Sequence, residues 1–280
     1  ILLSGTTLSI QLTSKLLKNL FVRYFFLLTV LLSGKVAAQS ATLATKENEL
    51  VSLYAKLLAH SDYDKTEQNA ANFAKELSNY LKANPSTLTY PFKKLTAKGY
   101  CFINTSADGK FRIYSWDTWT GGTMHFFNEI YQWTHNGKVF TKVLKYVAEE
   151  GDAGSYCSKI YTVSINQKNY YLAISNGIYS NRDVAQSISA FTIDNGKLND
   201  SVELFKTRTE NLNSIRVEYN FFSVVDRPER PVELISYDEK RKLVYVAVVD
   251  DQGTVSKRNL LYQLKENYFE YIGIETGKRK

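Results

Sequence analysis

Apolar residues recur at helical spacing in the first part of the chain after residue 48. One such stripe consists of Leu50, Leu53, Tyr54, Leu57 and Leu58. A second consists of Phe73, Leu77, Tyr80 and Leu81, and we expect its helix to begin near Asp64, with Glu67 as the capping-box partner. Pro85 ends this helix, because its ring removes a hydrogen-bond donor and clashes with a helical backbone. The two stripes predict a helical hairpin.

From Gly99 onward, apolar and polar positions alternate with the period of a β-strand. Turn pairs that tolerate positive φ separate the alternating runs, as at Asn136-Gly137 and Asn195-Gly196. The expected strands cover 99–105, 111–118, 123–135, 138–146, 156–165, 170–176, 186–193, 214–225, 242–249 and 258–264. No long helical pattern intervenes between them, so an antiparallel meander is the expected topology.

Three strand pairs resemble one another loosely: FRIYSWDT with IYQWTHNGK, YYLAISNG with SAFTIDNGK, and LVYVAVVD with YQLKENYF. Such repetition suits a long meander or propeller-like blades, although three units are fewer than the usual four to eight. The predicted fold is therefore mainly β, an antiparallel meander with a propeller-like arrangement as its alternative, behind a small N-terminal helical hairpin. We expect residues 39–97 to form the hairpin and its connection, and residues 98–280 to form the β domain.

Residues 1–38 have the order of a secretory signal peptide. They contain no acidic residue, and a basic stretch at 15–23 precedes a short apolar run at 24–32. Small residues at 36–38 then precede Gln39, the expected first residue of the mature chain. The apolar run is about half the length of a membrane-spanning helix. We therefore expect cleavage and a periplasmic or secreted protein with no membrane attachment, and we interpret residues 1–14 as an upstream extension.

The charge balance changes once this segment is removed. The chain has 35 Lys and Arg against 28 Asp and Glu, but four of the basic residues precede position 39. The mature part thus has 31 basic and 28 acidic residues. No clustered basic face is visible, so we expect no nucleic-acid partner. The 20 Tyr and 15 Phe lie mostly in the strand-like runs and can supply both a core and half-wet binding surfaces.

Two segments resemble known sequences. The stretch DGKFRIYSWDTWTGGTMH at 108–125, preceded by YPFKKL at 90–95, is similar to uncharacterised exported β-rich proteins of Bacteroidetes-type bacteria. The resemblance covers about a third of the mature chain. It implies an exported location and transfers no functional residue.

Cys101 and Cys157 are the only cysteines. In an oxidising compartment we expect a disulfide between them, with two buried free thiols as the main alternative. Two thiols without a nearby histidine are too few for a closed zinc site. His125 and His135 fall on one expected strand about 33 Å apart, too far to share a metal. Common metalloprotease, redox, hydrolase and nucleotide-binding motifs are absent from the sequence, so we expect no metal and no cofactor.

The hairpin 111–134 is the most site-like segment. If residues 119–122 form its loop, Trp116 faces His125 and Arg112 faces Glu129, all on one side of the sheet. One interpretation is a binding surface with Arg112 and Glu129 as polar anchors and Trp116 as a stacking platform. The other is a set of ordinary cross-strand pairs, each worth about 0.2–1 kcal/mol to the sheet.

Two functions remain open at this point. Aromatic strands, few histidines and no catalytic motif favour a non-enzymatic binding or envelope-associated module, with an unknown ligand or envelope protein as its partner. The alternative is a hydrolase acting on an envelope polymer or glycan, which needs two carboxylates across a cleft. Asp117 and Glu129 are the nearest such pair, and we expect them to face opposite sides of the sheet.

Overall fold

The computed structural model describes residues 41–59, 62–144 and 153–276. The expected signal segment and its cleavage position lie outside these residues. The chain divides into two units, Ile1–Asn48 and Glu49–Lys280. In the first unit the described residues 41–48 are helical. The rest of the description concerns the second unit.

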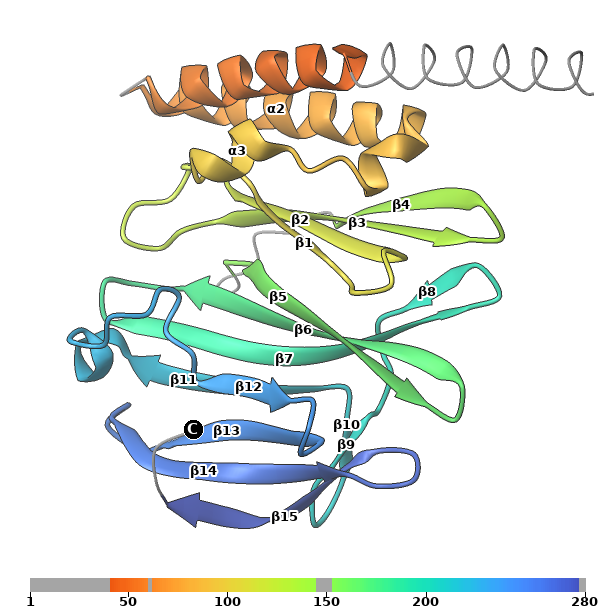
Figure 1. Cartoon of the computed structure of the whole chain (residues 1–280). Coiled ribbons are helices and arrows are strands. Elements are labelled where there is room, and N and C mark those ends of the chain that lie inside the picture. The colour runs from red at the N-terminus through yellow and green to blue at the C-terminus, as the bar shows by residue number, and fades with distance from the viewer. Residues whose placement is uncertain (1–40, 60–61, 145–152, 277–280) are drawn as a thin grey trace, which may run out of the picture. The chain divides into compact units, whose positions relative to one another are not determined.

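Helices open the second unit, as the apolar stripes predict (Figure 1). Residues 49–58 are helical, and α2 follows at Tyr63–Ala83. The cap of α2 is Asp62 rather than Asp64, since Asp62 Oδ1 accepts the backbone N–H groups of Asp64 and Lys65 at 3.1 and 3.5 Å. The helix ends before Pro85, where the 3₁₀ helix η1 (Pro85–Leu88) begins, and the short helix α3 (Lys93–Ala97) leads into the strands.

The strands form three sheets. The first sheet has the order β1-β2-β3-β4, with bounds Phe102–Thr105, Phe111–Asp117, Phe127–His135 and Lys138–Leu144. The second has the order β11-β7-β6-β5, with bounds Ser214–Asn220, Asp183–Asp194, Lys168–Ile178 and Tyr156–Ile165, and β8 (Lys197–Asn199) pairs with β7. The third has the order β10-β9-β15-β14-β13-β12, with bounds Asn211–Leu212, Phe205–Lys206, Phe269–Thr276, Val255–Leu264, Leu243–Val249 and Ile235–Asp238. The 3₁₀ helix η2 (Phe221–Val224) follows β11.

The strand pairs of these sheets are antiparallel apart from β15 with β9. The structure thus confirms the expectation of a mainly β chain built from antiparallel meanders behind a small helical hairpin. The described residues form three sheets, whereas closed propellers use four or more blades. These sheets do not establish the propeller-like alternative, which stays a prediction.

Three apolar clusters hold these layers together. The helices pack on one face of the first sheet around Phe73, Trp116 and Ile130. The other face of that sheet packs on the second sheet around Phe111 and Phe191. The second and third sheets share the largest cluster. Because both faces of the first sheet are covered, a polar side chain in its middle must be buried with a partner or lie at a strand end.

Candidate functional site

The register of the β2–β3 hairpin differs from the expected one. Arg112 pairs with Gln132, and Ser115 pairs with Glu129, whereas the predicted register paired Arg112 with Glu129. The partner of Arg112 is displaced by three positions, and an odd displacement moves side chains to the opposite face. Arg112 and Glu129 therefore lie on opposite faces of the first sheet, and the predicted shared face is wrong.

The physical reason is the loop, which spans residues 118–126 instead of four residues. The backbone N–H of Thr118 donates to the carbonyl oxygen of Phe126 at 2.8 Å. The backbone adopts positive φ at Trp119, at 55°, and not at Gly121 or Gly122. Gly121 is needed for a close approach instead, because a Cβ there would lie 1.9 Å from the carbonyl oxygen of Met124.

Arg112 is a buried structural cation. Its Nη1 donates to the carbonyl oxygens of Thr87 and Tyr90 at 2.7 and 2.6 Å, and its Nε donates to Thr105 Oγ1 at 2.6 Å. The side chain is 6% exposed. These bonds fasten the segment around η1 to β2, so Arg112 is unavailable as a binding anchor.

Trp116 is also buried, and Glu129 is half-buried with its Oε1 atom enclosed, in separate surroundings. Trp116 is 1% exposed and packs edge-on against Phe73 with ring centroids 5.5 Å apart, so it cannot serve as a stacking platform. Glu129 faces the interior between the first and second sheets, where its Oε2 accepts the hydroxyl of Tyr131 at 3.2 Å. Of the four predicted binding residues, His125 alone lies at an accessible site.

His125 contacts a carboxylate that the expected register placed on the other side of the sheet. Its Nδ1 lies 2.5 Å from Asp117 Oδ2, and the two side chains are 32% and 12% exposed. The backbone N–H of His125 donates to the carbonyl oxygen of Ile178 at 3.0 Å, which ties the loop to β6. In the described residues Nδ1 is the ring nitrogen with a hydrogen bond, so Nε2 is the one available to a ligand.

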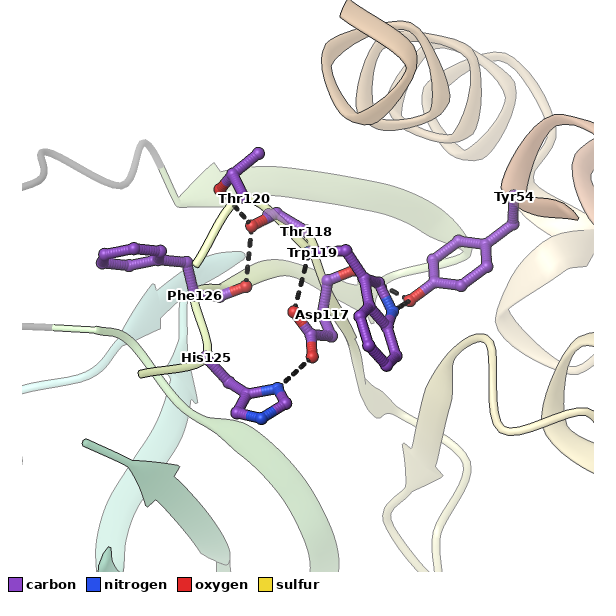
Figure 2. Close-up of polar contacts among 7 residues, drawn as sticks. All are labelled: Tyr54, Asp117, Thr118, Trp119, Thr120, His125 and Phe126. Carbon is purple, nitrogen blue, oxygen red and sulfur yellow. Dashed lines mark hydrogen bonds and ion pairs between the residues drawn. The ribbon is translucent and has the colours of Figure 1, made fainter. Parts of the chain in front are cut away.

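Asp117 also fixes an exposed indole, as Figure 2 shows. Its Oδ1 accepts the backbone N–H of Trp119 at 2.8 Å, an Asx turn that stabilises the positive φ of Trp119. The indole N–H of Trp119 donates to the hydroxyl of Tyr54 at 3.1 Å, and that hydroxyl donates to the carbonyl oxygen of Asp117 at 2.8 Å. Trp119 is nevertheless 49% exposed. A large aromatic surface is therefore held in one orientation.

The rings and polar groups of this site lie within contact of one another. Trp119 meets the His125 ring edge-on with centroids 5.9 Å apart, and His125 stacks on Phe127 at 6.4 Å. Burial, together with the nearby Asp117 carboxylate, raises the pKa of the Tyr54 hydroxyl well above its ordinary value. Tyr54 therefore stays neutral and keeps both of its hydrogen bonds at physiological pH. The site offers an indole face, an oriented imidazole and a partly exposed carboxylate.

Sequence reasoning missed the roles of Tyr54, Asp117 and Trp119. In the sequence, Tyr54 is one member of an apolar helix stripe. No neighbouring residue indicates that its hydroxyl bonds to the loop. The signal that was present is Asp117 two residues before Trp119, the spacing of an Asx turn. That spacing, directly after a strand, predicts a structured loop rather than a tight glycine reversal.

The two cysteines are not joined. Cys101 and Cys157 are free, buried thiols that belong to different clusters, one facing the helices and one between the first two sheets. The first sheet separates their surroundings, so the expectation of a disulfide is corrected in favour of its alternative. Burial also raises the pKa of both thiols well above the ordinary range, which keeps them unreactive.

Two further findings concern the part of the chain that the structure describes. No group of three His, Cys, Asp or Glu side chains there is arranged to hold a metal ion. No helix there is long and apolar enough to cross a bilayer. The comparisons with known proteins add nothing to this picture, since no family model matches the chain and no curated protein matches it either.

Proposed function

We propose that this chain is an exported, non-enzymatic binding module, and that Trp119, His125 and Asp117 form its ligand site. The observation that carries the proposal is the half-exposed indole of Trp119, which is anchored at its backbone by Asp117 and at its ring nitrogen by Tyr54. An aromatic ring held in one rotamer loses little conformational entropy when it binds a ligand. Exposed aromatic rings with a polar rim are typical anchors of binding surfaces.

The chemistry of the site favours a saccharide. The C–H face of a pyranose ring is apolar and flat enough to cover an indole, and its hydroxyl groups need hydrogen-bond partners at the edge. His125 Nε2 supplies such a partner, and the partly exposed Asp117 carboxylate that orients it lies beside it. An envelope polysaccharide is therefore the partner we propose, which is consistent with the signal-like order of residues 15–38.

Titration of the mature protein with soluble oligosaccharides tests this function. The probes are a β-1,4-linked N-acetylglucosamine tetramer and soluble muropeptides. Calorimetry and tryptophan fluorescence measure their binding. Trp119→Ala is expected to abolish binding with a loss of stability of about 0.5–1.5 kcal/mol, because one hydrogen bond to Tyr54 is lost. The matched control is Tyr63→Ala, which removes another exposed aromatic ring from α2. Equal binding by wild type and Trp119→Ala would contradict the proposed site.

One observation favours a hydrolase as the second candidate. An imidazole whose Nδ1 is held by a carboxylate is the arrangement of a general base, and Asp117 and His125 have it. In that case the same probes are cut, and Asp117→Asn lowers the rate of cleavage while the oligosaccharide still binds. Product analysis after long incubation distinguishes the two functions, since a binding module returns every probe intact.

A further inference from the structure

A pocket lies at the end of the second sheet where β6, β7 and β11 meet η2, next to the Trp119 loop, since Ile178 in its wall accepts the backbone N–H of His125. Its volume is about 300 Å³, which is at the lower end of the range for small-molecule sites. Apolar groups of Ile178, Val184, Phe221 and Val232 form much of its wall. This wall excludes water from one side of any small ligand. Hydrogen bonds between the ligand and polar groups of the pocket are therefore stronger than they would be in water.

Two tyrosines, Tyr156 and Tyr219, line the same pocket. Among the described residues, neither Tyr156 nor Tyr219 has a hydrogen bond at its hydroxyl, although both side chains make other contacts. The ring of Tyr156 is fixed by stacking on Phe102 with centroids 4.2 Å apart. Burial raises the pKa of Tyr156 to about 12 and that of Tyr219 above its ordinary value, so both are neutral donors at physiological pH.

The charge in the pocket has one sign. Arg230 is the single charged residue among those that line it. Its Nη1 donates to the carbonyl oxygens of Arg227 and Glu229, and one Nη2 hydrogen goes to Val225. These bonds fix the guanidinium and still leave its Nε–H and a second Nη2 hydrogen available. The neighbouring Arg227 adds no free charge, because it pairs with Glu229 at 2.6 Å.

We infer that this pocket binds a small carboxylic acid with an apolar body, its carboxylate held by Tyr156, Tyr219 and Arg230. A carboxylate has four lone-pair directions and no donor, so it matches a set of donors with no acceptor charge beside it. Charge-assisted hydrogen bonds of this kind are stronger than neutral ones. The apolar body would then contact Ile178, Val184 and Phe221. This pocket uses none of the side chains of the proposed saccharide site, although the two adjoin at the bond between His125 and Ile178.

The experiment uses benzoate and its neutral isostere benzamide with the full mature chain. Ligand-observed NMR and calorimetry are expected to detect benzoate and to give at least tenfold weaker binding for benzamide. Tyr219→Phe and Tyr156→Phe each remove a hydroxyl that has no protein partner, so each is expected to weaken benzoate about tenfold with an unchanged melting temperature. Two different variants are used so that an unexpected fold defect in one leaves the other informative.

The matched controls are Tyr237→Phe, which removes a hydroxyl outside the pocket, and Arg258→Gln, which removes an exposed cation on β14. Neither is expected to change benzoate affinity. Equal binding of benzoate and benzamide would overturn the inference, and so would full benzoate affinity in both Tyr→Phe variants. Trp119→Ala is expected to leave benzoate binding intact, which separates this pocket from the saccharide site: loss of one function does not entail loss of the other.

Discussion

Replacement of Glu129 by glutamine is expected to remove a large pH-dependent contribution to the stability of this protein, so that the variant is less stable than wild type at low pH and more stable at high pH. Although the residue as a whole is half-buried, its Oε1 atom is sealed from solvent and has no hydrogen-bond partner in the described residues. Its Oε2 accepts one bond, from the Tyr131 hydroxyl. Burial raises the pKa of Glu129 to about 8, and the Tyr131 bond offsets only part of that effect. The folded protein therefore holds a proton that the unfolded chain releases.

The sign and size follow from proton linkage. Between the unfolded pKa of 4.5 and the folded pKa of about 8, the folded state binds one proton more than the unfolded state, so the free energy of unfolding falls as pH rises. Stability is fully present below pH 4.5 and is lost as pH rises through about 8. At 1.36 kcal/mol per pKa unit, the loss between pH 4.5 and pH 7 is about 3 kcal/mol.

Urea unfolding of wild type and Glu129→Gln between pH 5 and pH 8.5 measures this difference. Glutamine cannot ionise, but its buried amide lacks a partner and costs about 1–3 kcal/mol at all pH values. We therefore expect the variant to be the less stable protein at pH 5 and the more stable one at pH 8.5. Comparison of the two proteins cancels the titration of other groups. Glu275→Gln, at an exposed strand position, is the matched control and should follow wild type.

Parallel stability curves for wild type and Glu129→Gln would refute the reasoning. They would mean that Glu129 ionises in the folded protein as easily as in the unfolded chain. Such a result would require solvent or a cation at Oε1 of Glu129. The pKa of Glu129 would then not be raised by burial between the first and second sheets.

Two further predictions concern the loop and the N-terminus. Gly121→Ala is expected to lower the free energy of unfolding by about 1–3 kcal/mol, because its Cβ would overlap the carbonyl oxygen of Met124, whereas Gly122→Ala meets nothing within 4 Å and should be close to neutral; thermal melts of both variants check this, and equal effects would contradict it. The exported protein is expected to begin at Gln39, after cleavage behind Ala38, and N-terminal sequencing of the extracytoplasmic fraction checks this; an uncleaved chain in the membrane fraction would contradict it.

Elements with local signals could be predicted from the sequence. The stripe of α2 and the stop at Pro85 depend on neighbouring residues, and the structure has both. The turns at Asn136-Gly137 and Asn195-Gly196 have positive φ at both positions, as type I′ hairpins require. In each case, residues close in sequence are sufficient to determine the local structure.

Elements that depend on distant partners were missed. The strands β9 and β10 have two residues each, too few for any alternation to register. The strand β15 carries Ile272 and Ile274 on an exposed face, so its pattern does not separate a buried side from a wet one. The expected run 214–225 instead ends at Asn220, whose side chain accepts the N–H of Phe222 and starts η2. This cap ends the strand at Asn220. The residues that follow are mostly apolar, so the sequence pattern alone does not show where the strand stops.

The candidate site shows why strand alternation alone was a poor guide to function here. Both registers of the β2–β3 hairpin satisfy alternation, and they differ only in how many residues the loop contains. The observed register buries Arg112 against the backbone carbonyl oxygens of Thr87 and Tyr90, which provide the partners that a buried cation needs. Because the side chains of Arg112 and Trp116 are buried in this way, the polar and aromatic side chains that a ligand can reach lie in the longer loop. Trp119 and His125 lie there because loops can expose side chains while the sheet below holds their backbone in place.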